Sequence, residues 1–591
     1  MDRPAAPALT PLTPRLPLPV RDETAVVQSL LDEIAPALDW QRVIARAAPW
    51  ITEVRRHPAP FWAMESLLKE YPISEPEGLA LMRLAEALLR VPDAETAVAL
   101  TADQLGRATF DLKGGEHAWI AALSANAIAL SKKLLPADGG EPGLFKRLGA
   151  QTVVSATVRA IQLLGRQFVL GQTIADAQRE AAAARKAQPN LRFSYDMLGE
   201  GARTEADAER YLESYCAAIQ SVAGGVRAAS PEAADGVSIK LSALHARYEE
   251  AQSAQVFEVL LPRLVRLIDL GAQAGINLTI DAEESERLEL SLDVFEALLA
   301  HIARAHPHWG GFGLAVQAYQ TRAAQVIDAV AALARKHGVR LMVRLVKGAY
   351  WDAEIKRAQE LGLDGYPVFT HKHHTDLSYL ACARRLFAAA PHIYPQFASH
   401  NAGTIAAVLE LAHAAGTPFE MQRLHGMGEG VYREVLADPA IACRVYAPVG
   451  AHRDLLAYLV RRLLENGANS SFVHQLADAS VAVVDLLASP LQLSSAATLP
   501  APPQLYGAAR ANSRGVDLVC RAARAPYLAA IAATPVPAVP LADAAAVTQA
   551  MQRAQAAQTA WNALGVTERA ACLNRAADAL EARSAEFCAV L

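Results

Sequence analysis

The sequence predicts an α/β protein built on a closed (β/α)8 barrel of the TIM type, preceded by an all-helical domain and a proline-rich arm. Strand-like runs alternate with amphipathic helical segments between residues 191 and 469, and nearly every run ends in polar or charged residues. Eight parallel strands joined by crossover helices close into one barrel, whose active site gathers at the carboxyl ends of the strands. The runs span residues 192–199, 236–244, 276–284, 311–319, 340–351, 392–401, 419–428 and 443–450.

The segments before the barrel are predicted to be helical, apart from the first. Residues 1–22 contain six prolines, which favour an extended arm over a helix. Residues 23–135 have helical periodicity throughout, with Ser74 and Glu77 at the spacing of a capping box, and are predicted to form a helical domain. Residues 136–188 are predicted to be a helical linker leading into a barrel of residues 189–480.

The segments after the barrel are predicted to be a linker and the start of another domain. Proline recurs in residues 481–542, which marks a linker. Residues 543–591 are helical in pattern, and we expect them to open a further domain.

Composition predicts a cytoplasmic protein. The 591 residues are 52% hydrophobic and 20% charged, and the formal charge of −5 provides no global basic field, so no nucleic-acid partner is expected. Six cysteines without a C-x-x-C pair predict neither a disulfide framework nor a cysteine zinc site. No signal peptide and no apolar run of about 18 residues is present, so no membrane span is expected.

Polar side chains at the predicted strand ends are the candidate site residues. Each of these residues follows or ends an apolar run. In a barrel without an active site, the stability of the fold would not require a charge at these positions. They are Asp196, Lys240, Asp281, Gln317, Arg344, His400, Asn401 and Tyr446.

Lys240 has apolar neighbours on both sides, and an unpaired ammonium there would be costly. We therefore expect a carboxylate partner, either Asp281 or Glu283 from the next run. The alternative is a Schiff-base lysine, because desolvation lowers the pKa of a lysine. The acidic run around Asp281 also suggests a metal site, but this run has no histidine that would complete a ligand set.

The helix after the eighth run carries two adjacent arginines, Arg461 and Arg462, with Tyr458 and Glu465 one turn to either side. Paired guanidinium groups at a barrel mouth suit a small carboxylate or a phosphate. The alternative is that both arginines are solvated on the barrel exterior.

The end of the fifth run combines Arg344, Lys347 and Gly348 with the aromatic residues Tyr350 and Trp351. Positive charge with close backbone access suits a pyrophosphate, and an aromatic plane suits a flat ring. Rim charges beside core aromatics are an equal alternative. No G-x-G-x-x-G follows a strand, so a Rossmann nucleotide site is not predicted.

The tract HKHHTD at residues 371–376 is the most metal-like short segment. Its histidines lack a carboxylate at a suitable spacing and match no zinc pattern, so no metal site is predicted. His400 and Asn401, which end a strand, are expected to hydrogen-bond a bound ligand.

The chain resembles the proline dehydrogenase half of proline utilization A, the bacterial bifunctional flavoprotein. The resemblance covers about residues 60–480, and residues 505–518 and 560–582 resemble the start of that family's aldehyde dehydrogenase half. The matching motifs are RFSYDMLGE, SIKLSALHARY, NLTIDAEES, VQAYQ, VRLVKGAYWDAEIKRAQ, FASHN, LHGMGE, RVYAPVG and YLVRRLLENGANSSF. Mild departures are Ser399 in place of threonine and Ala246 in place of proline.

This resemblance implies a site for FAD and a site for L-proline. Lys240, Asp281, Arg461 and Arg462 would be the catalytic set. The flavin residues would be Gln317, Arg344, Lys347, Gly348, Trp351, Thr370, His400, Asn401, Glu465 and Phe472. The proline residues would be Asp196, Lys240, Leu345, Tyr350, Tyr446, Tyr458, Arg461 and Arg462.

The implied reaction is oxidation of L-proline to Δ1-pyrroline-5-carboxylate by hydride transfer to flavin N5, the first step from proline to glutamate. Electrons would pass to a membrane quinone, with peripheral contact at the inner membrane. No ribbon-helix-helix segment is recognisable, so autoregulation through DNA is not expected. The sequence ends before the nucleophilic cysteine of the aldehyde dehydrogenase, so only the first of two steps is expected. The rivals are a Schiff-base or pyridoxal-phosphate enzyme using Lys240 and an inactive scaffold.

Overall fold

The computed structural model describes residues 15–57, 169–199, 201–225, 228–450, 472–492, 499–539 and 541–591. The chain divides into two compact units. The first comprises Met1–Ala358 and Asp364–Pro502, and the second comprises Gln359–Leu363 and Pro503–Leu591.

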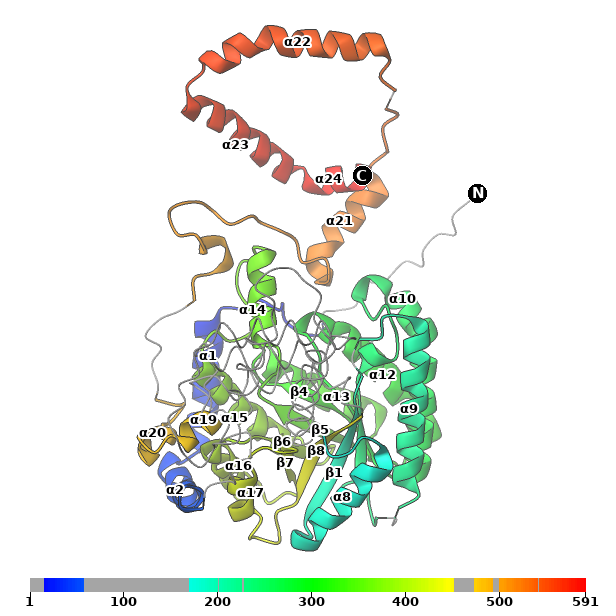
Figure 1. The fold of residues 1–591 in the computed structure, drawn as a ribbon, viewed down its shortest axis with the longest axis vertical. Helices are drawn as coiled ribbons and strands as arrows, with labels where there is room; N and C mark the ends of the chain where they lie inside the picture. The colour runs from blue at the N-terminus through cyan, green and yellow to red at the C-terminus, as the bar shows by residue number, and fades with distance from the viewer. Residues whose placement is uncertain are drawn as a thin grey trace, which may run out of the picture. The chain divides into compact units, whose positions relative to one another are not determined.

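The first unit contains a closed barrel of eight parallel strands in chain order, with β1 paired to both β2 and β8 (Figure 1). The predicted (β/α)8 fold is confirmed, and each predicted run overlaps one strand. The strands are β1 (Leu191–Met197), β2 (Gly236–Ile239), β3 (Asn277–Ile280), β4 (Phe312–Gln317), β5 (Leu341–Val346), β6 (Ile393–Ala398), β7 (Glu420–Leu424) and β8 (Cys443–Val449).

Strand residues alternate between the helical layer and the barrel interior. In β8, Cys443, Val445 and Ala447 belong to the hydrophobic core, whereas Arg444 and Tyr446 bond to side chains from other strands. The interior of this barrel is therefore polar at several levels, and those levels lead up to the site.

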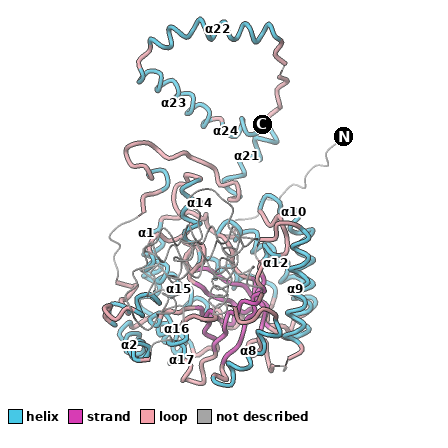
Figure 2. The backbone as a smooth tube through the Cα atoms, viewed as in Figure 1, coloured by secondary structure: helices cyan, strands magenta, loops and turns pink. Residues whose placement is uncertain are grey.

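Helices surround the strands, which are magenta in Figure 2. Thr204 and Asp207 form a capping box at the start of α9, and Gly275 and Gly338 end α11 and α13 in the left-handed conformation, with φ of 66° and 64°. The barrel helices are α8 (Ile174–Ala187), α9 (Glu205–Ala223), α11 (Leu261–Ala274), α12 (Leu288–Ala305), α13 (Ala323–His337), α14 (Trp351–Glu360), α15 (Lys372–Ala388), α16 (Ala402–Ala415) and α17 (Glu429–Val435).

The N-terminal segment lies on the outside of the barrel. Residues 15–22 contain no helix or strand, and Arg21 Nη1 donates to the carbonyl of Thr321 at 3.0 Å. Two helices follow, α1 (Glu23–Ile34) and α2 (Trp40–Arg56). Glu33 of α1 pairs with Arg385 of α15 at 2.6 Å. The rest of the predicted helical domain lies outside the described residues.

α2 also contacts segments that follow the barrel. Trp40 Nε1 donates to the carbonyl of Leu487 at 2.8 Å, and Arg55 donates to the carbonyl of Asp478 at 2.8 Å. Val43, Ala47 and Ile51, one turn apart, are fully buried. Two short helices lie in this later region, α19 (Phe472–Ala477) and α20 (Val483–Leu486).

In the described part of the second unit, residues 505–520 form turns and loops, and helices follow. Its helices are α21 (Arg521–Ala533), α22 (Ala544–Ala563), α23 (Val566–Ala582) and α24 (Ser584–Val590). The range predicted to be a linker thus contains a helix of 13 residues, α21. Among the described residues, no helix is both long enough and apolar enough to cross a membrane.

Candidate active site

Lys240 lies at the mouth of the barrel, immediately after β2, and is 5% exposed. Its Nζ donates to Asp196 Oδ1 on β1 at 2.6 Å, to Asp281 Oδ2 after β3 at 3.2 Å and to the hydroxyl of Tyr446 on β8 at 3.0 Å. Four residues from four strand ends therefore meet at one point.

The carboxylate partner expected for Lys240 is present. Asp281 is one of the two residues predicted for this role, and Asp196 is a second partner at the shorter distance. Glu283, the other residue predicted for it, accepts from the backbone N–H of Ser242 at 3.0 Å and from Arg287 at 2.5 Å. Burial raises the pKa of Glu283, and the charge of Arg287 opposes that shift.

Tyr446 connects Lys240 with Asp281. Its hydroxyl donates to Asp281 Oδ2 at 2.7 Å while accepting from Lys240. Burial raises the pKa of Tyr446 well above its usual value, and the charges of Asp196 and Asp281 raise it further. The phenol is therefore protonated at neutral pH and holds the carboxylate in place.

Arg344 occupies the interior of the barrel below this cluster, where it is 3% exposed. Its Nη1 donates to Asp281 Oδ1 at 2.8 Å and its Nε to Gln422 Oε1 at 2.8 Å. Its Nη2 donates to the hydroxyls of Ser194 and Ser238 at 3.1 and 3.0 Å. Asp281 is thus shared between an ammonium and a guanidinium.

A second charged pair lies nearer the amino ends of the strands. Arg444 and Glu420 are both fully buried, with Nε to Oε1 at 2.6 Å and Nη2 to Oε2 at 3.0 Å. Gln396 and Gln422 also donate to Glu420, at 2.7 and 2.8 Å. Because Gln422 also accepts from Arg344, one hydrogen-bond network runs from Arg444 up to Lys240.

The sequence prediction did not include Ser194, Ser238, Gln396, Glu420, Gln422 or Arg444. Their signal is the alternation of polar residues along apolar strands, as in the run FEMQRL that contains β7. In a barrel interior, such residues must find partners across the strands.

The predicted flavin residues on β4 and β5 hold the loop after β5. Gln317 Nε2 donates to the carbonyl of Glu283 at 2.8 Å, and its Oε1 accepts from the N–H of Ala349 at 3.2 Å. Gly348 has φ of +146°, and a Cβ there would lie 2.4 Å from the ring of Tyr319. Only glycine fits this close packing of the loop.

Lys347 and Trp351 are fixed by partners from the segments that follow β5 and β6. Lys347 Nζ pairs with Asp376 and donates to the hydroxyl of Thr404 at 3.2 Å. Trp351 Nε1 donates to the carbonyl of Phe369 at 2.8 Å, and its side chain is 37% exposed.

His400 and Asn401 follow β6. His400 Nε2 accepts from the backbone N–H of Leu424 at 3.1 Å, which requires a lone pair on that nitrogen. The proton of a neutral imidazole then lies on Nδ1. Asn401 Oδ1 caps α16 by accepting from the N–H of Thr404 at 2.9 Å.

Some predicted residues are not brought to this cluster. Leu345 lies on the face of β5 opposite Arg344, fully buried in the hydrophobic core, because neighbouring strand residues point to opposite sides. Leu424, the last residue of β7, pairs in register with Tyr446 of β8. By the same alternation, Leu424 faces the barrel interior, as Tyr446 does. Phe472 is 7% exposed at the start of α19, and Tyr350 is half-buried before α14. Tyr458, Arg461, Arg462 and Glu465 lie outside the described residues.

Thr370 has its donors engaged by the N-terminal helix. Its backbone N–H and its hydroxyl donate to the carboxylate of Glu23 at 3.0 and 2.8 Å. Among the described residues, the predicted flavin residues other than Thr370 and Phe472 lie on β4, β5 and β6 or just after them, and these strands are neighbours in the barrel.

Asp376 should make the barrel sensitive to acid. Burial raises its pKa, but the charges of Lys347 and Lys372 outweigh burial and lower the pKa to about 2, from the usual 3.8. A depressed folded-state pKa contributes stability above about pH 4 that is lost as the pH falls through about 2. We expect wild type to lose about 2 kcal/mol more than Asp376→Asn between those limits, in denaturant unfolding at each pH. Parallel pH profiles would contradict this.

The fold and its mouth define the class of protein. A closed parallel barrel with buried opposite charges converging at the carboxyl ends of its strands is the arrangement of a (β/α)8-barrel enzyme. A family model described as proline dehydrogenase matches residues 178–475, about half of the chain. The chain belongs to the proline dehydrogenase family.

PutA proteins are among the known proteins similar to this chain. The bifunctional protein PutA of Klebsiella aerogenes is 46% identical over 481 residues, which are 77% of this chain and 36% of the relative. PutA of Rhizobium meliloti is 41% identical over 525 residues, 84% of this chain and 41% of the relative. A crystal structure of a mutant of Bradyrhizobium japonicum proline utilization A matches with a TM-score of 0.74 and 45% identity, over 97% of this chain and 58% of that one. This chain therefore spans well under half the length of these curated relatives.

Two further family models match outside the barrel. The aldehyde dehydrogenase family matches residues 522–591, in agreement with the resemblance found there. A model described as the DNA-binding domain of proline dehydrogenase matches residues 63–168, which lie outside the described residues. This match conflicts with the expectation of no nucleic-acid partner, which rested on the charge of the whole chain and not on that of one segment.

Proposed function

We propose that this chain is an FAD-dependent L-proline dehydrogenase that forms Δ1-pyrroline-5-carboxylate. The observation that carries the proposal is the meeting of Lys240, Asp196, Asp281 and Tyr446 at the mouth of the barrel in a chain of the proline dehydrogenase family. A proline zwitterion presents a carboxylate and a secondary ammonium, and this mouth offers groups of both charges within one hydrogen-bond network.

The surroundings of Lys240 favour an ion-pairing role over covalent catalysis. Its Nζ faces three acceptors, which match the three protons of an ammonium, whereas a Schiff-base lysine needs a free lone pair. In the proposed reaction Lys240 orients the substrate together with Arg461 and Arg462, the two residues that the resemblance assigns to the proline carboxylate. Tyr446 and Tyr458 would pack against the ring.

The residues at the mouth fit a flavin. Gln317, Arg344, Lys347, His400 and Asn401 lie on or just after β4, β5 and β6, which are neighbours in the barrel. The chemistry of the donors also fits, because these residues supply amide, guanidinium, ammonium and imidazole groups to polar ring edges and phosphates. When bound there, FAD supplies the two-electron oxidation. Arg344 contributes positive charge fixed by four partners, which needs no rearrangement during the reaction.

The electron acceptor and the wider role are part of the same proposal. We propose that a membrane quinone reoxidises the protein through peripheral membrane contact, and that the reaction is the first step from proline to glutamate. The similarity to bifunctional PutA proteins supports a second, aldehyde dehydrogenase activity in a longer parent protein.

A visible spectrum of the purified protein tests this function. We expect a flavin spectrum that is bleached by L-proline in the absence of oxygen, because the substrate would reduce the bound cofactor. D-proline serves as the matched control and should bleach the spectrum much more slowly. A pyridoxal or imine band would support the Lys240 Schiff-base rival, and a protein that stays colourless after incubation with FAD would support the scaffold.

Nucleic-acid binding is a second candidate function, favoured by the match of residues 63–168 to the DNA-binding model. A gel-shift titration of duplex DNA at two salt concentrations tests it, because binding through phosphates weakens steeply with salt. Absence of any shift at low salt would remove this candidate.

A further inference from the structure

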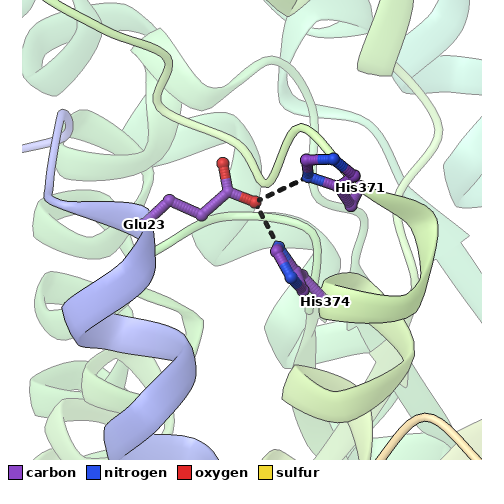
Figure 3. Close-up of side chains that lie close together, drawn as sticks. All are labelled: Glu23, His371 and His374. Atoms are coloured by element: carbon purple, nitrogen blue, oxygen red, sulfur yellow. Dashed lines mark hydrogen bonds and ion pairs between the residues drawn. The ribbon is translucent and has the colours of Figure 1, made fainter. Parts of the chain in front are cut away.

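The histidine tract that opens α15 acquires a carboxylate from a distant part of the sequence. Within the tract itself no carboxylate stands at a suitable spacing for a metal site. In the structure, Glu23, the first residue of α1, reaches this tract, and its carboxylate lies between His371 and His374 (Figure 3).

The three side chains converge through defined atoms. Glu23 Oε1 lies 2.5 Å from His374 Nδ1 and 3.8 Å from His371 Nδ1. All three ligand atoms lie within 4.8 Å of one another, and the three side chains are between 13 and 21% exposed. Zinc bonds of about 2.0–2.2 Å place tetrahedral ligand atoms roughly 3.3–3.5 Å apart, which lies between the two measured distances.

The carboxylate is oriented by a second layer of hydrogen bonds. Thr370 donates to Glu23 from its backbone N–H and from its hydroxyl, which reaches Oε2 at 2.8 Å. Burial raises the pKa of Glu23, but the hydrogen bonds from His374 and Thr370 outweigh burial, and the pKa is lowered. Outer hydrogen bonds of this kind fix the ligands of protein metal sites.

We propose that Glu23, His371 and His374 form a binding site for a first-row divalent cation of the zinc type. Two imidazole nitrogens and one carboxylate oxygen are the ligand set that zinc prefers, with water in the fourth position. Binding would require the Nδ1 lone pairs of both histidines, so the hydrogen bonds of His374 Nδ1 with Glu23 and of His371 Nδ1 with the Thr370 hydroxyl would be exchanged for metal bonds. The cation would fasten α1 to the start of α15.

A second cluster in the molecule provides a matched control. Asp269 Oδ1 accepts from His301 Nε2 and His306 Nε2, both at 2.7 Å. Among the described residues, Asp269 has no backbone donor like that of Thr370, and it is 37% exposed against 21% for Glu23. In this second cluster both histidines already bond to the same oxygen of Asp269, so we expect no cation to bind there.

The test is zinc uptake by the full chain after removal of metals with a chelator. Protein is dialysed against graded concentrations of free Zn²⁺, and zinc per chain is measured by mass spectrometry. We expect the double variant His371→Gln/His374→Gln to bind one zinc ion fewer than wild type, and His301→Gln/His306→Gln to match wild type. Thr370→Val should weaken zinc binding by about 10-fold, because one outer hydrogen bond is lost.

Hydrogen exchange separates this site from zinc bound elsewhere. Zn²⁺ should slow amide exchange in residues 23–34 of wild type and leave exchange there unchanged in the His371→Gln/His374→Gln variant. Circular dichroism of both metal-free proteins establishes that the variant is folded. Equal zinc content in wild type and the double variant, or zinc uptake without slower exchange in α1, would overturn the proposal.

Discussion

Replacement of Lys240 by methionine is expected to lower kcat/KM for L-proline by between about 30-fold and several thousand-fold, while the flavin content stays close to that of wild type. The methionine keeps the apolar contacts of the side chain but removes the charge that meets Asp196 and Asp281. Loss of one partner of a buried charge pair costs on the order of 2 to 5 kcal/mol, and each 1.4 kcal/mol is about tenfold in rate. Initial rates with an artificial electron acceptor measure the effect.

Lys336→Met is the matched control for this prediction. Lys336 also pairs with a carboxylate, Glu296, but its side chain is 64% exposed and lies on α13, away from the mouth. Its replacement should leave the rate unchanged. An unchanged rate in Lys240→Met would remove Lys240 from the site, and a borohydride-trapped substrate adduct on Lys240 would replace ion pairing by covalent catalysis.

Replacement of Glu420 by alanine is expected to lower the free energy of unfolding of the barrel by about 3 to 5 kcal/mol. The change leaves the fully buried guanidinium of Arg444 without its carboxylate, and it also removes the acceptor for Gln396 and Gln422. Guanidinium chloride unfolding, followed by near-ultraviolet circular dichroism, measures the loss.

The double variant Glu420→Met/Arg444→Met separates the charge from the packing. Because it leaves neither charge alone, it should be more stable than Glu420→Ala. The exposed control Lys336→Ala should cost no more than about 1 kcal/mol. If Glu420→Ala were no more damaging than this control, the buried pair would not be important to the barrel.

The barrel was predictable because its strands are apolar runs with polar ends. Their boundaries were predicted too long at the carboxyl side, as in the run 236–244, where β2 ends at Ile239. After β2, the side chain of Lys240 bonds to Asp196 and Asp281 at the barrel mouth, and the backbone N–H of Ser242 donates to Glu283. The recurring prolines of residues 481–542 indicate a linker and not the helix α21, which contains Pro526 in its interior.

The site was predictable in its residue types and less so in its contacts. The ion pair of Lys240 with Asp281 followed from the cost of a buried ammonium, and the structure adds Asp196 as the closer partner. The interior position of Arg344 and the outward position of Leu345 depend on which face of β5 points inward, which the runs alone do not determine. The contact of Glu23 with His374 joins residues 351 positions apart, so no local pattern could indicate it.

The contact of α2 with the segment after the barrel bears on how the chain folds during synthesis. Trp40 and its partner Leu487 are 447 positions apart, and at about 5–20 residues per second a ribosome needs roughly 20 to 90 s to make the intervening chain. For most of that time α16 and α17, the barrel helices against which α2 packs, are also unmade, so the apolar face of α2, with Val43, Ala47 and Ile51, lacks the surface that covers it. The apolar face of α2 therefore stays exposed on the nascent chain until the last part of the barrel has been made. During this interval a chaperone could bind it.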